Sequence, residues 1–376
     1  MLLDELKSIV GAGAWTTDGH ELQPHLTERR GAVSGRTLVM LSPANTDEVA
    51  AIVRACSRSG TSIVPQGGNT GLCGGAIPNE SGEQVLLSLS KMNQVRAIDA
   101  DDFSMTVEAG CILQHAQDAA AKVGRLVPLS LAAEGSCQIG GNIATNAGGI
   151  NVIRYGTMRQ QVLGLEVVLA NGEIWDGLRS LRKDTGGYDM KQVFIGSEGT
   201  LGVITAATLR LFPAITNATT ALVALETPLQ AVQLLAKLRG TIADSIVAFE
   251  LISDLAYRFG ADHVQENASP FGENHPWYVL LDSVSDPMSD KWQDVLAEAI
   301  GSGRIQDALI AKSGAEAKTF WRVRHAISDG QKGHGVSFKH DISVPVSRID
   351  RFMQTAEEAI LRLIPEARIV AFGHVG

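Results

Sequence analysis

The hydrophobic pattern of the first half alternates between short apolar runs and helical repeats. Thr37–Leu41 and Ser62–Val64 are apolar runs of strand length. The helix predicted between them begins after the N-cap residue Asn45 and ends at Gly60. Glu48, three positions after Asn45, completes a capping box. The same reading predicts strands at Gln84–Leu89, Ser104–Glu108 and Val203–Leu211, a helix over Ile112–Val123, and a hairpin of Val162–Leu169 and Glu173–Asp176 around Asn171-Gly172.

The pattern changes after Pro213, where we place a domain boundary that gives residues 1–212 and 213–376. Predicted strands are Thr220–Leu225, Ile246–Leu251, Trp277–Leu281 and the strictly alternating Val336–Val344; predicted helices are Thr227–Gly240, Asp290–Ile300, Ala315–Asp329 and Ser347–Leu363. This grouping predicts an α+β domain with an antiparallel sheet and helices on one of its faces.

Three glycine-rich loops lie in the first half, at residues 64–75, 139–149 and 194–202. So many glycines form neither a regular helix nor a strand, and they leave backbone N–H groups that can turn toward one anion. Three such loops indicate a long phosphate-containing cofactor across one domain. The Rossmann and Walker spacings are absent, so neither a nicotinamide fold nor an NTPase is supported.

Composition narrows the class of protein. The 32 basic and 41 acidic residues give a net charge of −9, which argues against a nucleic-acid partner. No apolar segment approaches the length of a membrane span, and the start lacks the order of a signal peptide. The four cysteines, Cys56, Cys73, Cys111 and Cys137, form no C-x-x-C pair, and we expect buried or half-buried free thiols in the cytoplasm.

Four motifs follow one another along the chain: Pro65–Ala76, Ile139–Gly149, Arg182–Asp189 and Phe194–Thr205. Together they resemble the FAD-binding motifs of the vanillyl-alcohol oxidase/p-cresol methylhydroxylase (PCMH) superfamily, in its D-2-hydroxyacid dehydrogenase branch. The resemblance implies a PCMH-type FAD-binding domain followed by a substrate, or cap, domain. It implies that FAD contacts Pro65, Gln66, Gly67, Gly68, Asn69, Thr70, Gly71, Leu72, Pro128, Leu129, Ser130, Gly135, Ser136, Ile139, Gly140, Gly141, Asn142, Ala144, Thr145, Gly149, Glu198, Gly199, Gly202, Val203 and Ile204. Thr70 stands where relatives with covalent flavin have histidine, so we expect non-covalent FAD.

Polar residues in the second half suggest a site for carboxylates. Arg324 and Ser328 are four apart and share a helix face, while Lys339 lies on the polar face of the predicted strand 336–344. Taken alone, two solvated polar faces are the simpler interpretation. The resemblance places Arg324, Ser328 and Lys339 at the positions that bind substrate carboxylates. His340 is predicted in the core, and Arg322 and His325 on the surface.

His374 matches the opening of a family metal motif, His-x-Gly-Asp-Gly-Asn-x-His, which implies zinc or manganese. The other ligands and the proton-accepting histidine would lie beyond Gly376, so we expect the chain to continue.

The resemblance implies FAD-dependent oxidation of a D-2-hydroxy acid, such as 2-hydroxyglutarate or lactate, to the 2-oxo acid by hydride transfer to flavin N5. It also implies an electron-transfer flavoprotein or a quinone as acceptor, and a homodimer is possible. Three alternatives stay open: a non-catalytic FAD subunit of an electron-transfer complex, another reductase on this fold that uses NADPH, and an inactive truncated binding module.

Overall fold

The computed structural model describes residues 1–376 except 1, 216, 243–244, 268, 285–290 and 336. The chain forms two compact units. The first consists of Met1–Gly149 and Gly156–Ala214, and the second of Ile150–Tyr155 and Ile215–Gly376. The short helix α6 (Val152–Tyr155) therefore groups with the second unit, where it contacts strand β13.

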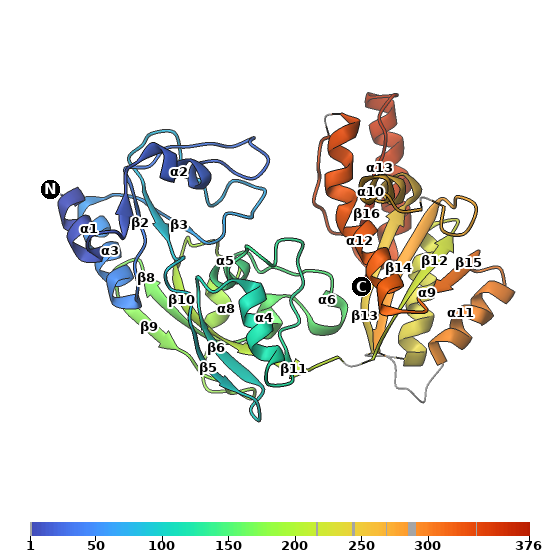
Figure 1. Ribbon diagram of the computed structural model, residues 1–376, viewed down its shortest axis with the longest axis horizontal. Coiled ribbons are helices and arrows are strands. Elements are labelled where there is room, and N and C mark those ends of the chain that lie inside the picture. Colours follow the sequence, from blue (N-terminus) through green and yellow to red (C-terminus); the bar gives the residue numbers. More distant parts are fainter. Residues whose placement is uncertain (1, 216, 243–244, 268, 285–290, 336) are drawn as a thin grey trace. The chain divides into compact units, whose positions relative to one another are not determined.

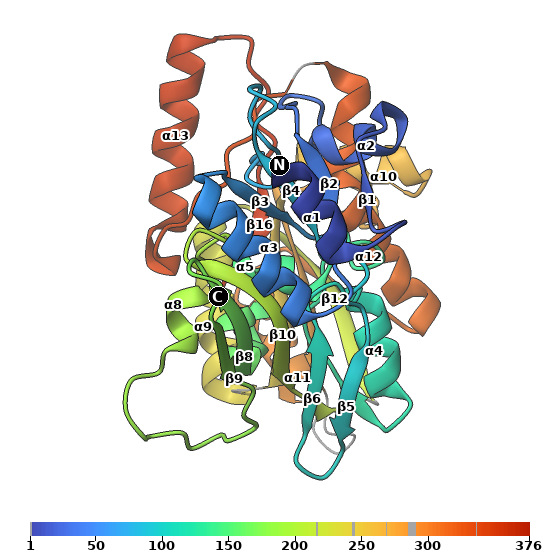
Figure 2. The ribbon, with the colours of Figure 1, turned by 90° about the vertical axis from the view of Figure 1, so that its left-hand side faces the viewer.

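The first unit begins with a small mixed sheet of strand order β1-β2-β4-β3. Strands β2, β3 and β4 run parallel, and helices α1 and α3 lie side by side against them (Figure 2). Asn45 accepts a hydrogen bond from the Glu48 N–H, and Gly60 ends α3 at φ 68°, as predicted. The elements are α1 (Leu2–Val10), β1 (Trp15–Thr16), α2 (Gly19–Leu26), β2 (Val39–Leu41), α3 (Thr46–Ser59), β3 (Ile63–Gln66) and β4 (Val85–Ser88).

A second, antiparallel sheet of order β5-β6-β10-β8-β9 completes this unit. The predicted hairpin forms, with β8 paired to β9 across Asn171-Gly172. Residues of α4, α5 and the sheet share one hydrophobic core. The elements are β5 (Val95–Asp99), β6 (Ser104–Glu108), α4 (Leu113–Ala121), β7 (Arg125–Leu126), α5 (Ile139–Ala144), α7 (Met158–Gln161), β8 (Val162–Leu169), β9 (Ile174–Gly177), α8 (Lys191–Phe194), β10 (Gly202–Arg210) and β11 (Phe212–Pro213).

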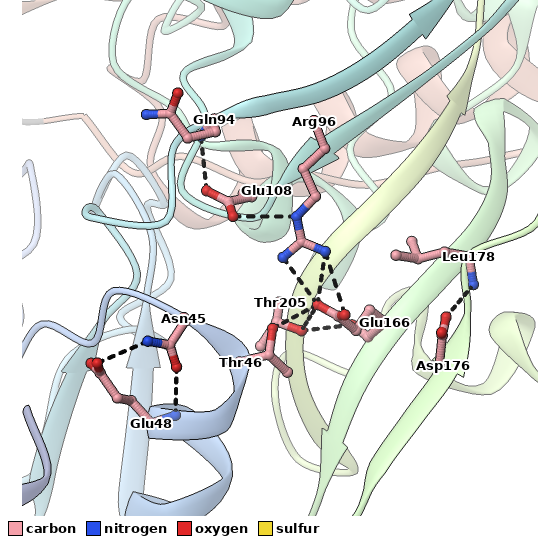
Figure 3. Close-up of polar contacts among 10 residues, drawn as sticks. All are labelled: Asn45, Thr46, Glu48, Gln94, Arg96, Glu108, Glu166, Asp176, Leu178 and Thr205. Atoms are coloured by element: carbon pink, nitrogen blue, oxygen red, sulfur yellow. Dashed lines mark hydrogen bonds and ion pairs between the residues drawn. The ribbon is translucent and has the colours of Figure 1, made fainter.

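A polar network joins this sheet to α3 (Figure 3). The Glu166 carboxylate accepts hydrogen bonds from the hydroxyls of Thr46 and Thr205 and pairs with Arg96, which also pairs with Glu108. Burial alone would raise the pKa of Glu166, but the bonds from Thr46, Thr205 and Arg96 bring it below its usual value. The ionised carboxylate therefore stabilises the folded unit.

We expect Glu166→Gln to lower the free energy of unfolding by about 1–3 kcal/mol at neutral pH. The folded pKa lies below the ordinary value of 4.5, so this stabilisation is complete above that pH and is lost as the pH falls through the folded pKa. Urea unfolding at several pH values checks this, with the exposed Glu80→Gln as control. If the free energy of unfolding of Glu166→Gln falls with decreasing pH as steeply as that of the original protein, Glu166 is not the source of this pH dependence.

The second unit contains an antiparallel sheet of order β15-β12-β14-β13-β16. Figure 1 shows helices on both of its faces, and two separate cores agree: α9 and α11 pack on one face, α10 and α12 on the other. The prediction of helices on one face is wrong because the central strands are buried on both sides, which gives continuous apolar runs. The elements are β12 (Ala218–Leu225), α9 (Pro228–Ile242), β13 (Ile246–Ser253), α10 (Asp254–Val264), β14 (Trp277–Val284), α11 (Lys291–Gly301), β15 (Asp307–Ile310), α12 (Gly314–Gly330), the 3-10 turns η2 (Gln331–His334) and η3 (Val346–Arg348), α13 (Ile349–Leu363) and β16 (Phe372–His374).

The predicted strand at 336–344 does not form. Residue 336 lies outside the described residues, and residues 337–344 belong to no helix or strand. The sheet ends with β15 at one edge and β16 at the other, residues 337–344 pair with neither of them, and the apolar Phe338 is 83% exposed. His340 is exposed, so the prediction of a core histidine is also wrong.

Two further sequence expectations concern burial. Cys56, Cys111 and Cys137 are buried free thiols as predicted, whereas Cys73 is exposed because it lies at the tip of the first glycine loop. Among the described residues, no helix combines the length and apolar character required for a membrane span.

Candidate cofactor and substrate sites

The first glycine loop follows β3 with its backbone donors unused. Among the described residues, none of the N–H groups of Gly67–Gly75 donates a hydrogen bond to another protein group. The loop is held by side chains instead. Gln66 donates to the carbonyls of His25 and Ala76, and Asn69, at φ 49°, donates to those of Pro24 and Thr27. The result is an ordered loop with a row of available donors.

The second loop packs directly against the first. A Cβ atom at Gly68 would lie 2.0 Å from the Ser136 carbonyl oxygen, and one at Gly67 would lie 3.5 Å from Gln138 Oε1. That oxygen is buried and has no hydrogen-bond partner among the described residues. A Cβ atom at Gly140 would lie 2.6 Å from the Ala109 side chain, so this glycine allows α5 to approach β6. Glycine is therefore required at Gly68 and Gly140 by close backbone approach.

The third loop supports the other two. A Cβ atom at Gly199 would lie 2.7 Å from Pro65 of β3, and the Glu198 N–H donates to the Ala144 carbonyl. The N–H groups of Gly196, Ser197 and Thr200 also donate to the backbone, so this loop offers few donors to a cofactor. The segment Pro128–Ser130 joins the cluster, because a Cβ atom at Gly149 would lie 2.2 Å from the Ser130 carbonyl oxygen.

These observations test whether the first unit fits FAD. An anionic pyrophosphate requires N–H donors, and the first loop has them available. A polar hydrogen of the cofactor requires an acceptor, and Gln138 Oε1 is a buried acceptor without a partner. Gly71 and Gly141 face open space, since a Cβ atom there would meet nothing within 4 Å. The residues present therefore fit the cofactor.

The three predicted substrate residues lie together in the second unit. Arg324 and Ser328 are one turn apart on α12, and Lys339 Nζ lies 3.4 Å from the Ser328 carbonyl oxygen. Lys339 reaches this place from an irregular segment and not from the predicted strand. Arg322 and His325 are exposed, as predicted.

Glu250 is a site residue that the sequence did not single out. Its side chain is 0% exposed, and it pairs with Arg324 Nη2 at 2.5 Å and contacts Nδ1 of His374, its cross-strand partner on β16. Burial alone would raise the pKa of Glu250, but His374 and Arg324 bring it below its usual value. The sequence does carry a sign of this site, because Glu250 is a carboxylate inside the apolar run Ile246–Leu251. A charged side chain in a buried strand requires a polar or charged partner.

The described residues do not by themselves form the predicted metal site. No group of three or more histidine, cysteine, aspartate or glutamate side chains converges among them. His374 has Glu250 as an acidic neighbour, and a divalent ion needs more ligands than this pair.

Comparison with known families agrees with this geometry. Residues 37–177 match the FAD binding domain, and residues 216–376 match the C-terminal domain of FAD linked oxidases. The D-2-hydroxyglutarate dehydrogenase of Bos taurus is 37% identical over 99% of this chain. The chain belongs to the D-2-hydroxyacid dehydrogenase branch of the FAD-linked oxidases. The enzyme of this name from Arabidopsis thaliana is 34% identical over 98% of the chain, and that from Xanthomonas citri pv. viticola is 36% identical over 90%.

The chain spans about two thirds of the length of these relatives: 66% of the Arabidopsis protein, 68% of the bovine one and 71% of that from Xanthomonas. Solved structures confirm the PCMH-type fold. A 4-ethylphenol oxidase from Gulosibacter chungangensis has a TM-score of 0.76 at 17% identity, covering 100% of this chain and 80% of its own. A p-cresol methylhydroxylase has a TM-score of 0.68 at 16% identity, covering 88% and 70%.

Proposed function

We propose that this FAD-linked oxidase oxidises a D-2-hydroxy acid to the 2-oxo acid. The observation that carries the proposal is the loop Gly67–Gly75, whose backbone donors are ordered and unused. Relatives named as D-2-hydroxyglutarate dehydrogenases support the class of substrate.

Each unit contributes different groups to this function. In the first, the donors of Gly67–Gly71 hold the pyrophosphate, and Gln138 accepts a hydrogen bond from the cofactor. Thr70 offers no histidine nitrogen for a covalent bond, so the flavin is held by contacts alone. Bound FAD supplies the hydride acceptor for oxidation at C2.

In the second unit, the Arg324 guanidinium and the Lys339 ammonium bind substrate carboxylate, and the Ser328 hydroxyl donates a further hydrogen bond. Two cations favour a dicarboxylate such as 2-hydroxyglutarate over lactate. Holding the acid in one orientation contributes the proximity effect on the rate. The electron acceptor proposed is an electron-transfer flavoprotein or a quinone. A cytoplasmic location stays a prediction, and several relatives are named as mitochondrial proteins.

Anaerobic mixing of the FAD-loaded protein with single hydroxy acids tests the function. We expect D-2-hydroxyglutarate to bleach the visible flavin absorbance, D-lactate to do so more weakly, and the L-enantiomers to have no effect. NADPH is the control for a reductase on the same fold. A flavin that only NADPH reduces, or that no hydroxy acid reduces, would contradict the proposal.

A further inference from the structure

We propose that Glu250 is the positioning residue for the substrate-binding groups of the second unit. This inference rests on the proposed function for its substrate, and on contacts within the second unit for its geometry. The carboxylate lies on β13 and contacts two side chains from different elements: Arg324 of α12 and His374 of β16. It therefore sets the relative position of both.

The first contact orients the Arg324 guanidinium. Arg324 Nε donates to Glu250 Oε2 at 2.8 Å, and Nη2 pairs with the same oxygen at 2.5 Å. The Phe372 ring lies 4.7 Å from the guanidinium carbon and packs against it. With Nε and Nη2 directed at the buried carboxylate, both N–H groups of Nη1 are left as donors for a substrate carboxylate.

The second contact fixes the His374 imidazole. His374 Nδ1 contacts Glu250 Oε1, so the ring on β16 is tied to the same carboxylate as the guanidinium on α12. Glu250 thus holds Arg324 and His374 next to each other.

The chain offers a matched control in Asp282. This half-buried carboxylate lies on the neighbouring strand β14 and contacts the same helix, accepting hydrogen bonds from Trp321 Nε1 at 2.9 Å and from the Thr220 hydroxyl at 2.6 Å. No contact to Arg324 or His374 is recorded for it among the described residues. A purely structural role for Glu250 would make the two carboxylates equivalent.

The test compares Glu250→Gln with Asp282→Asn in the FAD-loaded protein. We expect both to lower the melting temperature, whereas only Glu250→Gln lowers kcat/KM for D-2-hydroxyglutarate, by about 10–100-fold as for other residues that orient a ligand-binding side chain. Adding Glu250→Gln to Arg324→Lys should cost much less than the product of the two single effects. Equal losses of kcat/KM in the two carboxylate variants, or multiplicative losses with Arg324→Lys, would overturn the proposal.

A second readout does not depend on activity. In protein labelled with 15N-arginine, the Nε–H signal that disappears in Arg324→Lys should be protected from exchange with solvent, because this N–H donates to the buried Glu250 carboxylate. In Glu250→Gln the same N–H should exchange faster, whereas in Asp282→Asn its exchange should not change. An unchanged Arg324 signal in Glu250→Gln would overturn the role of Glu250. If no hydroxy acid reduces the original protein, the proposed function fails, and this spectrum alone decides whether Glu250 positions Arg324.

Discussion

Gly68→Ala is expected to weaken FAD binding. The added Cβ atom would lie 2.0 Å from the Ser136 carbonyl oxygen, so the first and second loops must separate. Overpacking of this kind costs about 1–3 kcal/mol. We expect the FAD dissociation constant to rise by about 5- to 140-fold, because 1.4 kcal/mol corresponds to a factor of ten. Titration of the purified variant with FAD, followed by flavin fluorescence, measures the change.

Two other glycines separate loss of the cofactor from loss of the fold. A Cβ atom at Gly71 meets nothing within 4 Å, so Gly71→Ala clashes with FAD alone and should weaken binding at an unchanged melting temperature. Gly240 of α9 also has open space and lies outside all the predicted FAD-binding motifs, so Gly240→Ala should leave FAD affinity unchanged. If Gly71→Ala and Gly240→Ala bind FAD equally well, the pyrophosphate does not lie on the first glycine loop.

Arg324→Ala is expected to affect both substrate binding and stability. Removing the guanidinium leaves the Glu250 carboxylate, which is 0% exposed, without its arginine partner and in contact with His374. Breaking a buried ion pair costs about 3–5 kcal/mol. We expect a strongly raised KM for D-2-hydroxyglutarate, a lower melting temperature and unchanged FAD affinity. Stopped-flow reduction and thermal unfolding measure these quantities.

Ser328→Ala separates the two effects of Arg324→Ala. Ser328 is exposed one turn along α12, so its substitution should leave the stability within about 0.5 kcal/mol. We still expect a raised KM, because the hydroxyl donates to the substrate. If Arg324→Ala lowers FAD affinity while KM stays the same, Arg324 does not belong to the substrate site.

The sequence predicted those elements whose signals are local. The helix between Asn45 and Gly60 and the hairpin at Asn171-Gly172 depend on caps and turns within the segment itself. The strand at 336–344 was wrong because alternation specifies a face but does not supply a neighbouring strand. Helices on both faces of the second sheet were missed because a continuous apolar run does not report how many faces are covered.

The cofactor loops show the same limit at the site. Glycine content located all three loops, and it could not show that the third donates its N–H groups to the protein. The role of Gln138 depends on Gly67, which is distant in sequence and near in space. Glu250 was missed for the same reason: its partners Arg324 and His374 lie on α12 and β16.

Both the proposed oxidation and the role of the glycine loops require FAD in the first unit. Direct titration of the purified protein with FAD, followed by gel filtration, tests this claim. We predict stoichiometric, saturable binding, a yellow protein peak and full release of the flavin on unfolding, as expected for a non-covalent cofactor. A folded protein that elutes colourless and binds no FAD would contradict the account.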